Sequence, residues 1–294
     1  MSALRDLVAE ELRASVDPKV SAMAEAIAEK HAPASRAVLF YGSCLRQQQL
    51  EGLMLDFYLI VSDYRSAYPK RWLASANRLI PPNVFYFEHG GLVSKYAVLS
   101  EADFARECGP DAFTVSTAAR FAQPSRLVWS ADAQAEARVL DTVSHAAPTL
   151  LDWTLPLAGG GDPEAIWRCA FGLTFAAELR AERLNRSSSI VDADPQRYHR
   201  FGLRALEETG KMPPSMSEAR ARRWWKKMQR RGKWYSVARL AKASFTFAGG
   251  VDYIAWKVNR HAGTDIQIKP WQRRWPLLAA VSLLPRLLRS GAVR

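Results

Sequence analysis

The chain has 294 residues, 48% of them hydrophobic and 24% charged, so it can bury a substantial core and is long enough for two domains. Its three cysteines, Cys44, Cys108 and Cys169, have no metal-ligand spacing and are odd in number, which argues against a disulfide framework and indicates a reducing compartment. Residues 1–13 place acidic residues between apolar residues at helical spacing, a pattern that suits neither a secretory signal nor an acid-poor transit peptide. We therefore expect a bacterial-type cytoplasm, at the inner face of the membrane.

The first half of the sequence predicts helices followed by a strand-rich core. Two helices are expected within 4–30, with Pro18 near their junction, and the core is expected from Ala37 to about Trp129. Within the core we expect, in chain order, a helix over 66–79 that ends before Pro81-Pro82, a strand over 84–88, a turn at Gly90-Gly91, a strand over 92–99 and a short helix over 101–107 capped by Ser100.

The second half predicts helices. A helical connection from Asp132 to about Thr154 leads to the glycine-rich stretch 159–163, which is the best domain boundary, and a further helix is expected over 164–184. We predict three parts: a catalytic domain over 1–158, a helical domain over 159–269 and a C-terminal segment over 270–294. No internal repeat or low-complexity tract is evident.

One stretch carries a chemical signature. The apolar strand 37–41 ends in Gly42-Ser43, and the next strand, 54–61, carries Asp56. Glycine lets a backbone approach a phosphate, the hydroxyl of Ser43 adds a donor beside exposed amides, and Asp56 can hold Mg²⁺ against phosphates. This order is typical of a nucleoside triphosphate site, although Gly-Ser after a strand is also a common structural turn.

Several motifs together resemble the mitochondrial-type CDP-diacylglycerol synthase (phosphatidate cytidylyltransferase) family of the nucleotidyltransferase superfamily. These motifs occur in the same order as in the family and are spread over most of the chain. They are the segments 41–47, 54–57, 95–98, 173–180 with Asn185 and Tyr198, and 239–257 around Phe247-Ala248-Gly249. The resemblance implies an α+β fold, with a nucleotidyltransferase-like mixed sheet and flanking helices, a mainly helical second domain and a C-terminal amphipathic helix. It also implies transfer of CMP from CTP to phosphatidic acid, giving CDP-diacylglycerol and pyrophosphate for phospholipid biosynthesis.

The second acid of the superfamily's Asp-x-Asp pair is missing, because Tyr58 stands two residues after Asp56. Hydrophobic residues are also found there in the family that the chain resembles, so the departure argues mainly against a standard two-ion site. Asp63 would need a turn after Val61 to return, since seven strand residues span roughly 23 Å and reverse the face. Glu88 is the other candidate, provided that its strand lies beside that of Asp56.

The remaining site candidates are basic or polar. Lys95 is expected on a strand, where it would neutralise the triphosphate or the lipid phosphate, or else be an edge-strand lysine turned to solvent. Tyr41, Gly42, Ser43 and Arg46 would bind the nucleotide. By resemblance, Arg180 and Asn185 would close the pocket from the second domain, although charged rows on that helix are usually solvated. The five histidines are scattered and receive no role.

Charge is spread unevenly along the chain. Lys and Arg number 15 against 17 acids in residues 1–150, and 26 against 12 in residues 151–294. From Lys211 onward basic residues alternate with tryptophans, a composition that suits an anionic bilayer surface and equally attracts nucleic acid.

The C-terminal segment favours the membrane. Aromatic and basic residues at 271–275 precede an apolar run over 277–288. Pro285 and Arg286 interrupt this run, and it is too short to span a bilayer. Such a segment is suited to lying in the interface, whereas the plainer alternative is a helix packed on the protein's own core.

The sequence as a whole predicts a peripheral membrane nucleotidyltransferase that uses CTP, Mg²⁺ and phosphatidic acid and binds no nucleic acid. A phosphate monoester is already an oxyanion near neutral pH, so catalysis reduces to alignment with the α-phosphate and charge neutralisation. Two alternatives remain: a nucleic-acid-directed nucleotidyltransferase, and a non-catalytic membrane-binding protein that retains the fold.

Overall fold

The structure is a computed structural model, and it describes residues 2–47, 50, 52–178, 190–209, 216–246 and 267–271. The helices of the first half are α1 (Ala3–Arg13), α2 (Pro18–Glu29), α3 (Ser43–Gln47), α4 (Tyr64–Ala67), α5 (Arg71–Leu79), α6 (Glu101–Cys108) and α7 (Ser116–Phe121). Those that follow are α8 (Ala133–Ala158), α9 (Pro163–Phe175), α11 (Pro195–Thr209) and α12 (Glu218–Thr246). The strands are β1 (Ser35–Tyr41), β2 (Met54–Val61), β3 (Asn83–His89), β4 (Leu92–Ser100) and β5 (Ser125–Ser130).

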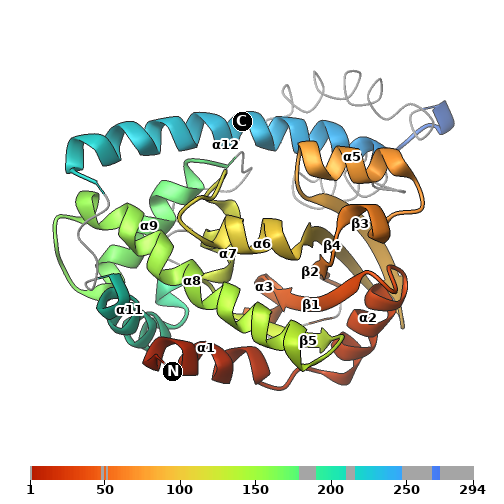
Figure 1. Cartoon of the computed structure of the whole chain (residues 1–294), viewed down its shortest axis with the longest axis horizontal. Coiled ribbons are helices and arrows are strands. Elements are labelled where there is room, and N and C mark those ends of the chain that lie inside the picture. The colour runs from red at the N-terminus through yellow and green to blue at the C-terminus, as the bar shows by residue number, and fades with distance from the viewer. Residues whose placement is uncertain are drawn as a thin grey trace.

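The five strands form one mixed sheet in the order β3-β4-β2-β1-β5. β2 and β4 are parallel, and the other neighbouring pairs are antiparallel. Helices flank the sheet, and α12 runs along one side of the molecule (Figure 1). The chain therefore has the predicted α+β fold with a mixed sheet and flanking helices. The predicted C-terminal amphipathic helix lies largely outside the described residues.

Alternation along the strands gives each face of the sheet its own apolar core, because successive side chains point to opposite faces. Val38, Phe40 and Phe57 pack on one face with residues of α2 and α4. Leu39 and Ile60 pack on the other face with residues of α1, α6, α7 and α8. This second core also contains residues from beyond the predicted boundary, including Trp167, Phe171, Tyr198 and Trp225. The division into domains at residue 158 stays a prediction.

Most helix boundaries follow from capping residues in the sequence. Ser100 accepts the backbone N–H of Asp103 at the start of α6, as predicted, and Asp132 accepts that of Ala135 at the start of α8. Gly159 ends α8 in the left-handed conformation with φ 67°. The β3–β4 hairpin around Gly90-Gly91 is also confirmed.

Two predicted helices differ from the structure. The single helix expected over 66–79 is instead two, α4 and α5, because Pro69 lacks an N–H and forces Tyr68 into an extended conformation (φ −127°, ψ 127°). The helix expected over 164–184 begins as predicted, but α9 ends at Phe175. There the backbone tightens, with Ala177 N–H donating to Thr174 and Glu178 N–H to Phe175, so Glu178 lies beyond the helix.

The N-terminal helix is tied to the second half of the chain by an ion pair. Arg197 on α11 is 8% exposed and holds both carboxylate oxygens of Glu11 on α1, with 2.9 Å between Nη2 and Oε1. The same guanidinium donates to the carbonyl of Ala122 and lies 4.1 Å from the ring centroid of Phe201. The buried guanidinium of Arg197 therefore makes an ion pair, a hydrogen bond to the backbone and a ring contact at the same time.

We expect Arg197→Ala to reduce the free energy of unfolding by about 3 kcal/mol, because removing one partner of a buried pair leaves the other charge desolvated. Urea denaturation measures the loss. Arg204→Ala, which removes an exposed ion pair with Glu207 on the same helix, is the matched control and is expected to cost about 0.5 kcal/mol or less. Equal small losses in both variants would contradict a structural role for the Arg197–Glu11 pair.

Within the described part of the chain, no helix is both long enough and apolar enough to cross a membrane.

Candidate functional site

Three predicted site residues lie side by side across the middle of the sheet. Tyr41 at the end of β1 is the register partner of Asp56 on β2, and Asp56 is the partner of Lys95 on β4. Paired residues on neighbouring strands point to the same face. The Lys95 ammonium lies 3.0 Å from Asp56 Oδ1, and the two side chains are 33% and 17% exposed. The structure thus brings together an acid and a base that are 39 residues apart in the sequence.

Gly42 brings the backbone against the carboxylate of Asp56. Its φ of 97° lies in a region that side-chain-bearing residues rarely adopt. A Cβ built at this position would lie 2.7 Å from Asp56 Oδ2, closer than any ordinary contact. Both the turn and the approach to Asp56 therefore require glycine.

The segment after Gly42 forms the short helix α3, which begins at Ser43. Ser43 is half-buried, and the neighbouring Cys44 is buried with its thiol 3.4 Å from the carbonyl of Met54. Burial and then the charge of Asp56 raise the pKa of the Cys44 thiol, so it stays protonated. Arg46 lies on α3, and its side chain is outside the described part of the structure. So are the predicted site residues Arg180 and Asn185.

Arg120 on α7 belongs to the site and was not predicted from the sequence. Its Nη1 donates to the Tyr41 hydroxyl at 3.0 Å, and its guanidinium lies 5.0 Å from the Tyr41 ring and 5.9 Å from the Tyr58 ring. Burial disfavours the charged form of Arg120. Electrostatic interactions with four residues outweigh this effect and raise the pKa of Arg120 well above its ordinary value; they are Tyr41, Tyr58, Glu178 and Asp56. Tyr41 is itself buried, so its role is to hold Arg120 rather than to offer an open surface.

Helix α12 brings further positive charge toward the same region. Arg239 is half-buried, and its electrostatic environment includes Tyr58, Glu178 and Arg120; burial lowers its pKa. One turn later, burial and then the charge of Arg239 lower the pKa of Lys242 to about 7. The Lys242 ammonium donates to the carbonyls of Ile80 and Pro82 before β3. Arg239 therefore adds positive charge beside Tyr58 and Arg120, where the carboxylate of Glu178 also lies.

Glu88 does not meet the condition for sharing an ion with Asp56. Its register partner is Val93 on β4, so β4 lies between β3 and β2. Two strand spacings separate the strands of the two acids by roughly 10 Å. The Glu88 carboxylate accepts the hydroxyl of Tyr86 instead. Asp63, the other acid considered, caps α4 by accepting the backbone N–H groups of Arg65 and Ser66.

The donor set around Asp56 limits which metal ion fits. Among the described residues no three His, Cys, Asp or Glu side chains group closely enough to hold a metal by themselves. Mg²⁺ is commonly bound by one or two carboxylates together with substrate phosphates and water. With the ligands that the described residues offer, Asp56 therefore fits an ion that arrives with a nucleotide.

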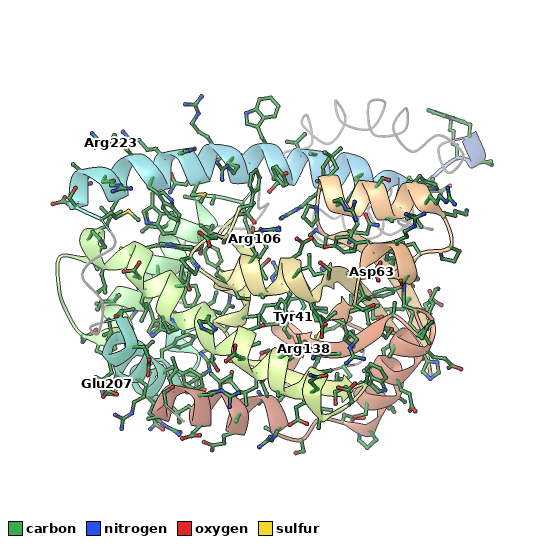
Figure 2. The ribbon with its side chains drawn as sticks, viewed as in Figure 1. Tyr41, Asp63, Arg106, Arg138, Glu207 and Arg223 are labelled. Carbon is green, nitrogen blue, oxygen red and sulfur yellow. The ribbon has the colours of Figure 1, made fainter. Side chains whose placement is uncertain are left out.

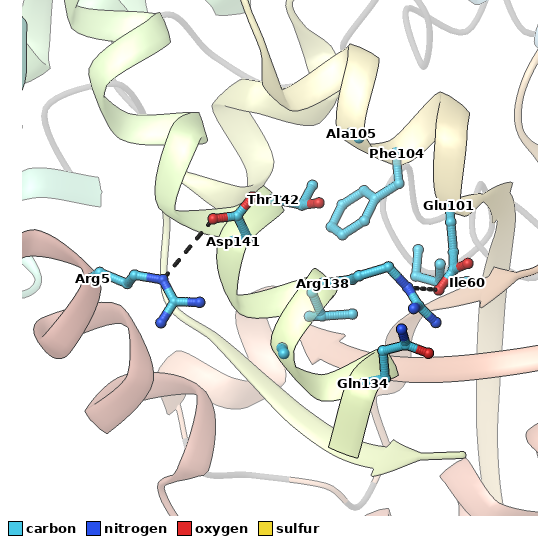
Figure 3. Close-up of a pocket in the computed structure, with 11 residues that line it drawn as sticks. Arg5, Ile60, Glu101, Phe104, Ala105, Gln134, Arg138, Asp141 and Thr142 are labelled. Carbon is cyan, nitrogen blue, oxygen red and sulfur yellow. Dashed lines mark hydrogen bonds and ion pairs between the residues drawn. The ribbon is translucent and has the colours of Figure 1, made fainter. Parts of the chain in front are cut away.

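A pocket of about 460 Å³ lies elsewhere on the molecule, between α1, α6 and α8 (Figure 3). Phe104 and Ile60 line its apolar part. Its charged groups pair with one another, Arg138 Nε with Glu101 at 2.8 Å and Arg5 with Asp141 at 4.0 Å. Because these charged groups already bind one another, they are less available to a ligand than the groups around Asp56. The residues around Asp56 are therefore the stronger candidate site.

Comparison with known proteins gives distant structural similarity. No protein-family model matches the chain, and no curated protein matches it. A solved nucleotidyltransferase-like protein from Exiguobacterium sibiricum 255-15 is similar over 92% of each chain, with 12% sequence identity and a TM-score of 0.30. At these values the similarity assigns neither a family nor an activity to the chain.

Proposed function

We propose that the chain is a nucleotidyltransferase that transfers CMP from CTP to the phosphate of phosphatidic acid. The observation that carries the proposal is the position of Asp56, which lies beside Lys95 on one neighbouring strand and against Gly42 at the end of the other. The motif resemblance supplies the donor, CTP, and the acceptor, phosphatidic acid. The enzyme would act at the inner face of the cytoplasmic membrane.

In the proposed reaction a phosphate oxygen of phosphatidic acid attacks the α-phosphorus of CTP. The bond from that phosphorus to the oxygen bridging to the β-phosphate breaks, and pyrophosphate leaves with both electrons of the bond. The attacking oxygen is already ionised, so the protein needs to align the two phosphates and offset their charge rather than remove a proton.

Different residues of the site would bind different phosphate groups. The Gly42 backbone and the Ser43 hydroxyl would hold the terminal phosphates, since the glycine leaves no side chain between backbone and ligand. Lys95 would turn from Asp56 to a phosphate when substrate arrives. Arg120 would offset charge on the departing pyrophosphate, with Tyr41 holding its guanidinium in place.

Mg²⁺ entering with CTP would be held by Asp56 and would supply charge neutralisation at the phosphates. With Asp56 engaged in this way, the Lys95 ammonium would turn to the acceptor phosphate. The pair therefore keeps the carboxylate satisfied until the nucleotide binds.

Pyrophosphate release tests the proposal. Purified protein is mixed with Mg²⁺, phosphatidic acid in mixed micelles and one nucleotide at a time. We expect pyrophosphate and CDP-diacylglycerol from CTP, and rates at least tenfold lower from ATP, GTP or UTP. The micelles make the assay independent of bilayer binding.

Three results would reject the proposal. Equal use of ATP and CTP would contradict the assignment of CTP. Release that depends on an added oligonucleotide rather than on phosphatidic acid would identify a nucleic-acid-directed enzyme, and absence of turnover with every acceptor would favour a non-catalytic protein.

A further inference from the structure

The outward side of α12 is strongly basic. The helix has 29 residues, which corresponds to a length of about 43 Å. Its exposed basic residues are Arg220, Arg222, Arg223, Lys226, Lys227, Arg230 and Lys233, and its sequence contains one acid, Glu218. Among the described residues Glu218 pairs with Arg222, so six positive charges remain uncompensated along the helix. Figure 2 shows Arg223 on the outer side of α12.

An apolar patch continues this basic surface. Trp234 and Val237 are 75% and 48% exposed. They lie eleven and fourteen residues after Arg223, on the same side of the helix as Lys227 and Arg230. The neighbouring helix α5 exposes Trp72 (48%) and Leu79 (73%), seven residues apart and hence on one side of that helix. Leu79 lies beside α12, because its carbonyl accepts the hydroxyl of Tyr235, and large exposed apolar side chains next to a basic surface mark an interaction surface.

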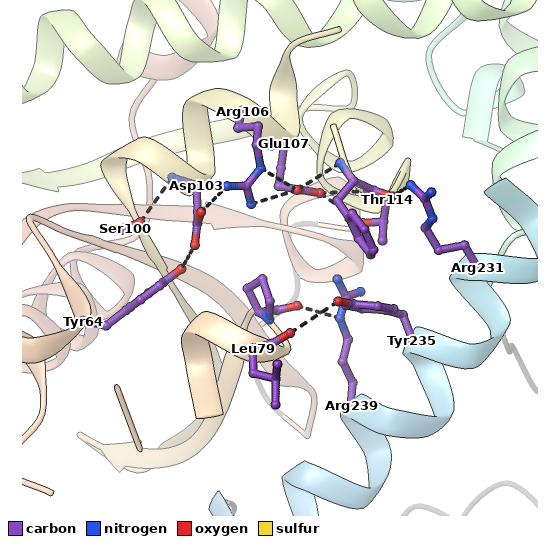
Figure 4. Close-up of polar contacts among 12 residues, drawn as sticks. Tyr64, Leu79, Ser100, Asp103, Arg106, Glu107, Thr114, Arg231, Tyr235 and Arg239 are labelled. Carbon is purple, nitrogen blue, oxygen red and sulfur yellow. Dashed lines mark hydrogen bonds and ion pairs between the residues drawn. The ribbon is translucent and has the colours of Figure 1, made fainter. Parts of the chain in front are cut away.

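The inner side of α12 is fixed to the protein. Ala221, Trp225, Met228 and Gly232 are buried, and α12 packs against α8, α9 and β3. In Figure 4, Tyr235 donates to the carbonyl of Leu79 at 3.3 Å, Arg239 to that of Pro81 at 2.8 Å and Arg231 to that of Phe113 at 3.1 Å. The helix is thus held as a rigid edge of the molecule, with only its basic and aromatic side outward.

We infer that this surface, the outward side of α12 with Trp72 and Leu79 of α5, docks on an anionic lipid bilayer. Each basic residue near a bilayer with anionic lipids strengthens binding to it, and tryptophan favours the interface between lipid and water. Exposed leucine and valine side chains also fit the acyl boundary better than a phosphate backbone.

The inference rests on and refines the proposed function, because the helix that meets the bilayer also carries Arg239, whose electrostatic environment includes Arg120 of the proposed site. It does not depend on catalysis, however, since bilayer binding is measured without nucleotide. Failure of the two ideas is therefore distinguishable.

Co-sedimentation with vesicles tests the inference. The full chain is mixed with vesicles of phosphatidylcholine alone or with phosphatidylglycerol, at 0.1 M salt and without CTP. We expect binding only to the anionic vesicles. The variant Arg223→Glu, Lys227→Glu, Arg230→Glu should lower the partition coefficient by roughly 100-fold or more, because three charges near the surface are reversed. Trp234→Ala should lower it about tenfold through lost apolar insertion.

The matched control is Lys19→Glu, Arg200→Glu, Arg204→Glu, which makes the same change of charge at exposed positions of α2 and α11, on the far side of the molecule from α12 (Figure 1). It should keep binding within about threefold, since charges beyond a Debye length are screened. Thermal unfolding checks that all variants fold.

The inference is overturned if the α12 variant binds as the wild type does or loses no more than the control. Binding of that kind would come from another part of the chain, such as residues 272–294. It is also overturned if duplex DNA displaces the protein from vesicles while Trp234→Ala has no effect, because the surface would then recognise phosphate charge alone.

Discussion

Replacing Asp56 with Asn is expected to lower CTP turnover by at least about 10³-fold while the protein still folds. The substitution keeps the shape of the side chain and removes the charge that would hold Mg²⁺ beside the phosphates. It also removes the partner of Lys95, whose ammonium lies 3.0 Å away. Because Lys95 is one-third exposed, water can replace that contact, and the fold should lose little stability. Pyrophosphate release and thermal unfolding measure the two effects separately.

Glu101→Gln provides the control for Asp56→Asn. Glu101 lies at the start of α6 and pairs with Arg138 at 2.8 Å, in the pocket of Figure 3. The variant loses one carboxylate charge, as Asp56→Asn does, together with its ion pairs to Arg138 and Arg36, at a position outside the proposed site. We expect turnover within about twofold of wild type, because salt and water screen the effect of a single partly exposed charge that lies outside the site. Wild-type turnover in the Asp56→Asn variant would end the assignment of Asp56 as the metal ligand.

The sequence predicted the sheet better than the arrangement of the site. Alternating apolar residues and the Gly90-Gly91 turn were sufficient for β3 and β4, since hairpin pairing is local. The parallel pairing of β2 with β4 joins strands separated by two helices and β3, and no local pattern encodes it. Asp56 and Lys95 were therefore each predicted to belong to the site, but their contact was not. The same non-local pairing places β4 between Asp56 and Glu88.

Arg120 shows what a sequence pattern leaves out. It is the one charged residue in the six-residue helix α7, whose other residues include the buried Ala118, Ala119 and Phe121. A lone arginine in an apolar stretch indicates a buried charge with a partner, but the partner, the Tyr41 hydroxyl, lies 79 residues away. Arg239 fell within a segment marked by the family resemblance, yet its place near Arg120 depends on the packing of α12.

The basic, tryptophan-rich composition after Lys211 left membrane and nucleic acid open as partners. In the folded chain, residues of the same type in this segment differ in whether they are buried or exposed. Trp225 is buried and donates to the carbonyl of Trp153, whereas Trp234, nine residues later on the same helix, is 75% exposed. A tryptophan count therefore overstates the proposed membrane surface, because the direction of each side chain decides whether it can belong to that surface.

Gly42→Ala is expected to lower CTP turnover by at least about 100-fold and to reduce the free energy of unfolding by about 1–3 kcal/mol. Two effects act together. The φ of 97° is strained for alanine, and the new methyl group would lie 2.7 Å from Asp56 Oδ2, which forces the carboxylate or the backbone to move. A shift of about 1 Å in a group that positions reacting phosphates is enough to cost two orders of magnitude in rate.

Gly91→Ala separates these two effects. Gly91 also has a positive φ, 75°, but a Cβ there meets nothing within 4 Å. This control carries the backbone strain without the contact and should lose about 1 kcal/mol of stability with unchanged turnover. The kinetic difference between the two variants then measures the contact with Asp56. If Gly42→Ala turns over CTP as fast as Gly91→Ala does, the close approach of the turn to Asp56 has no part in the reaction, and the phosphate-binding role of Gly42 is wrong.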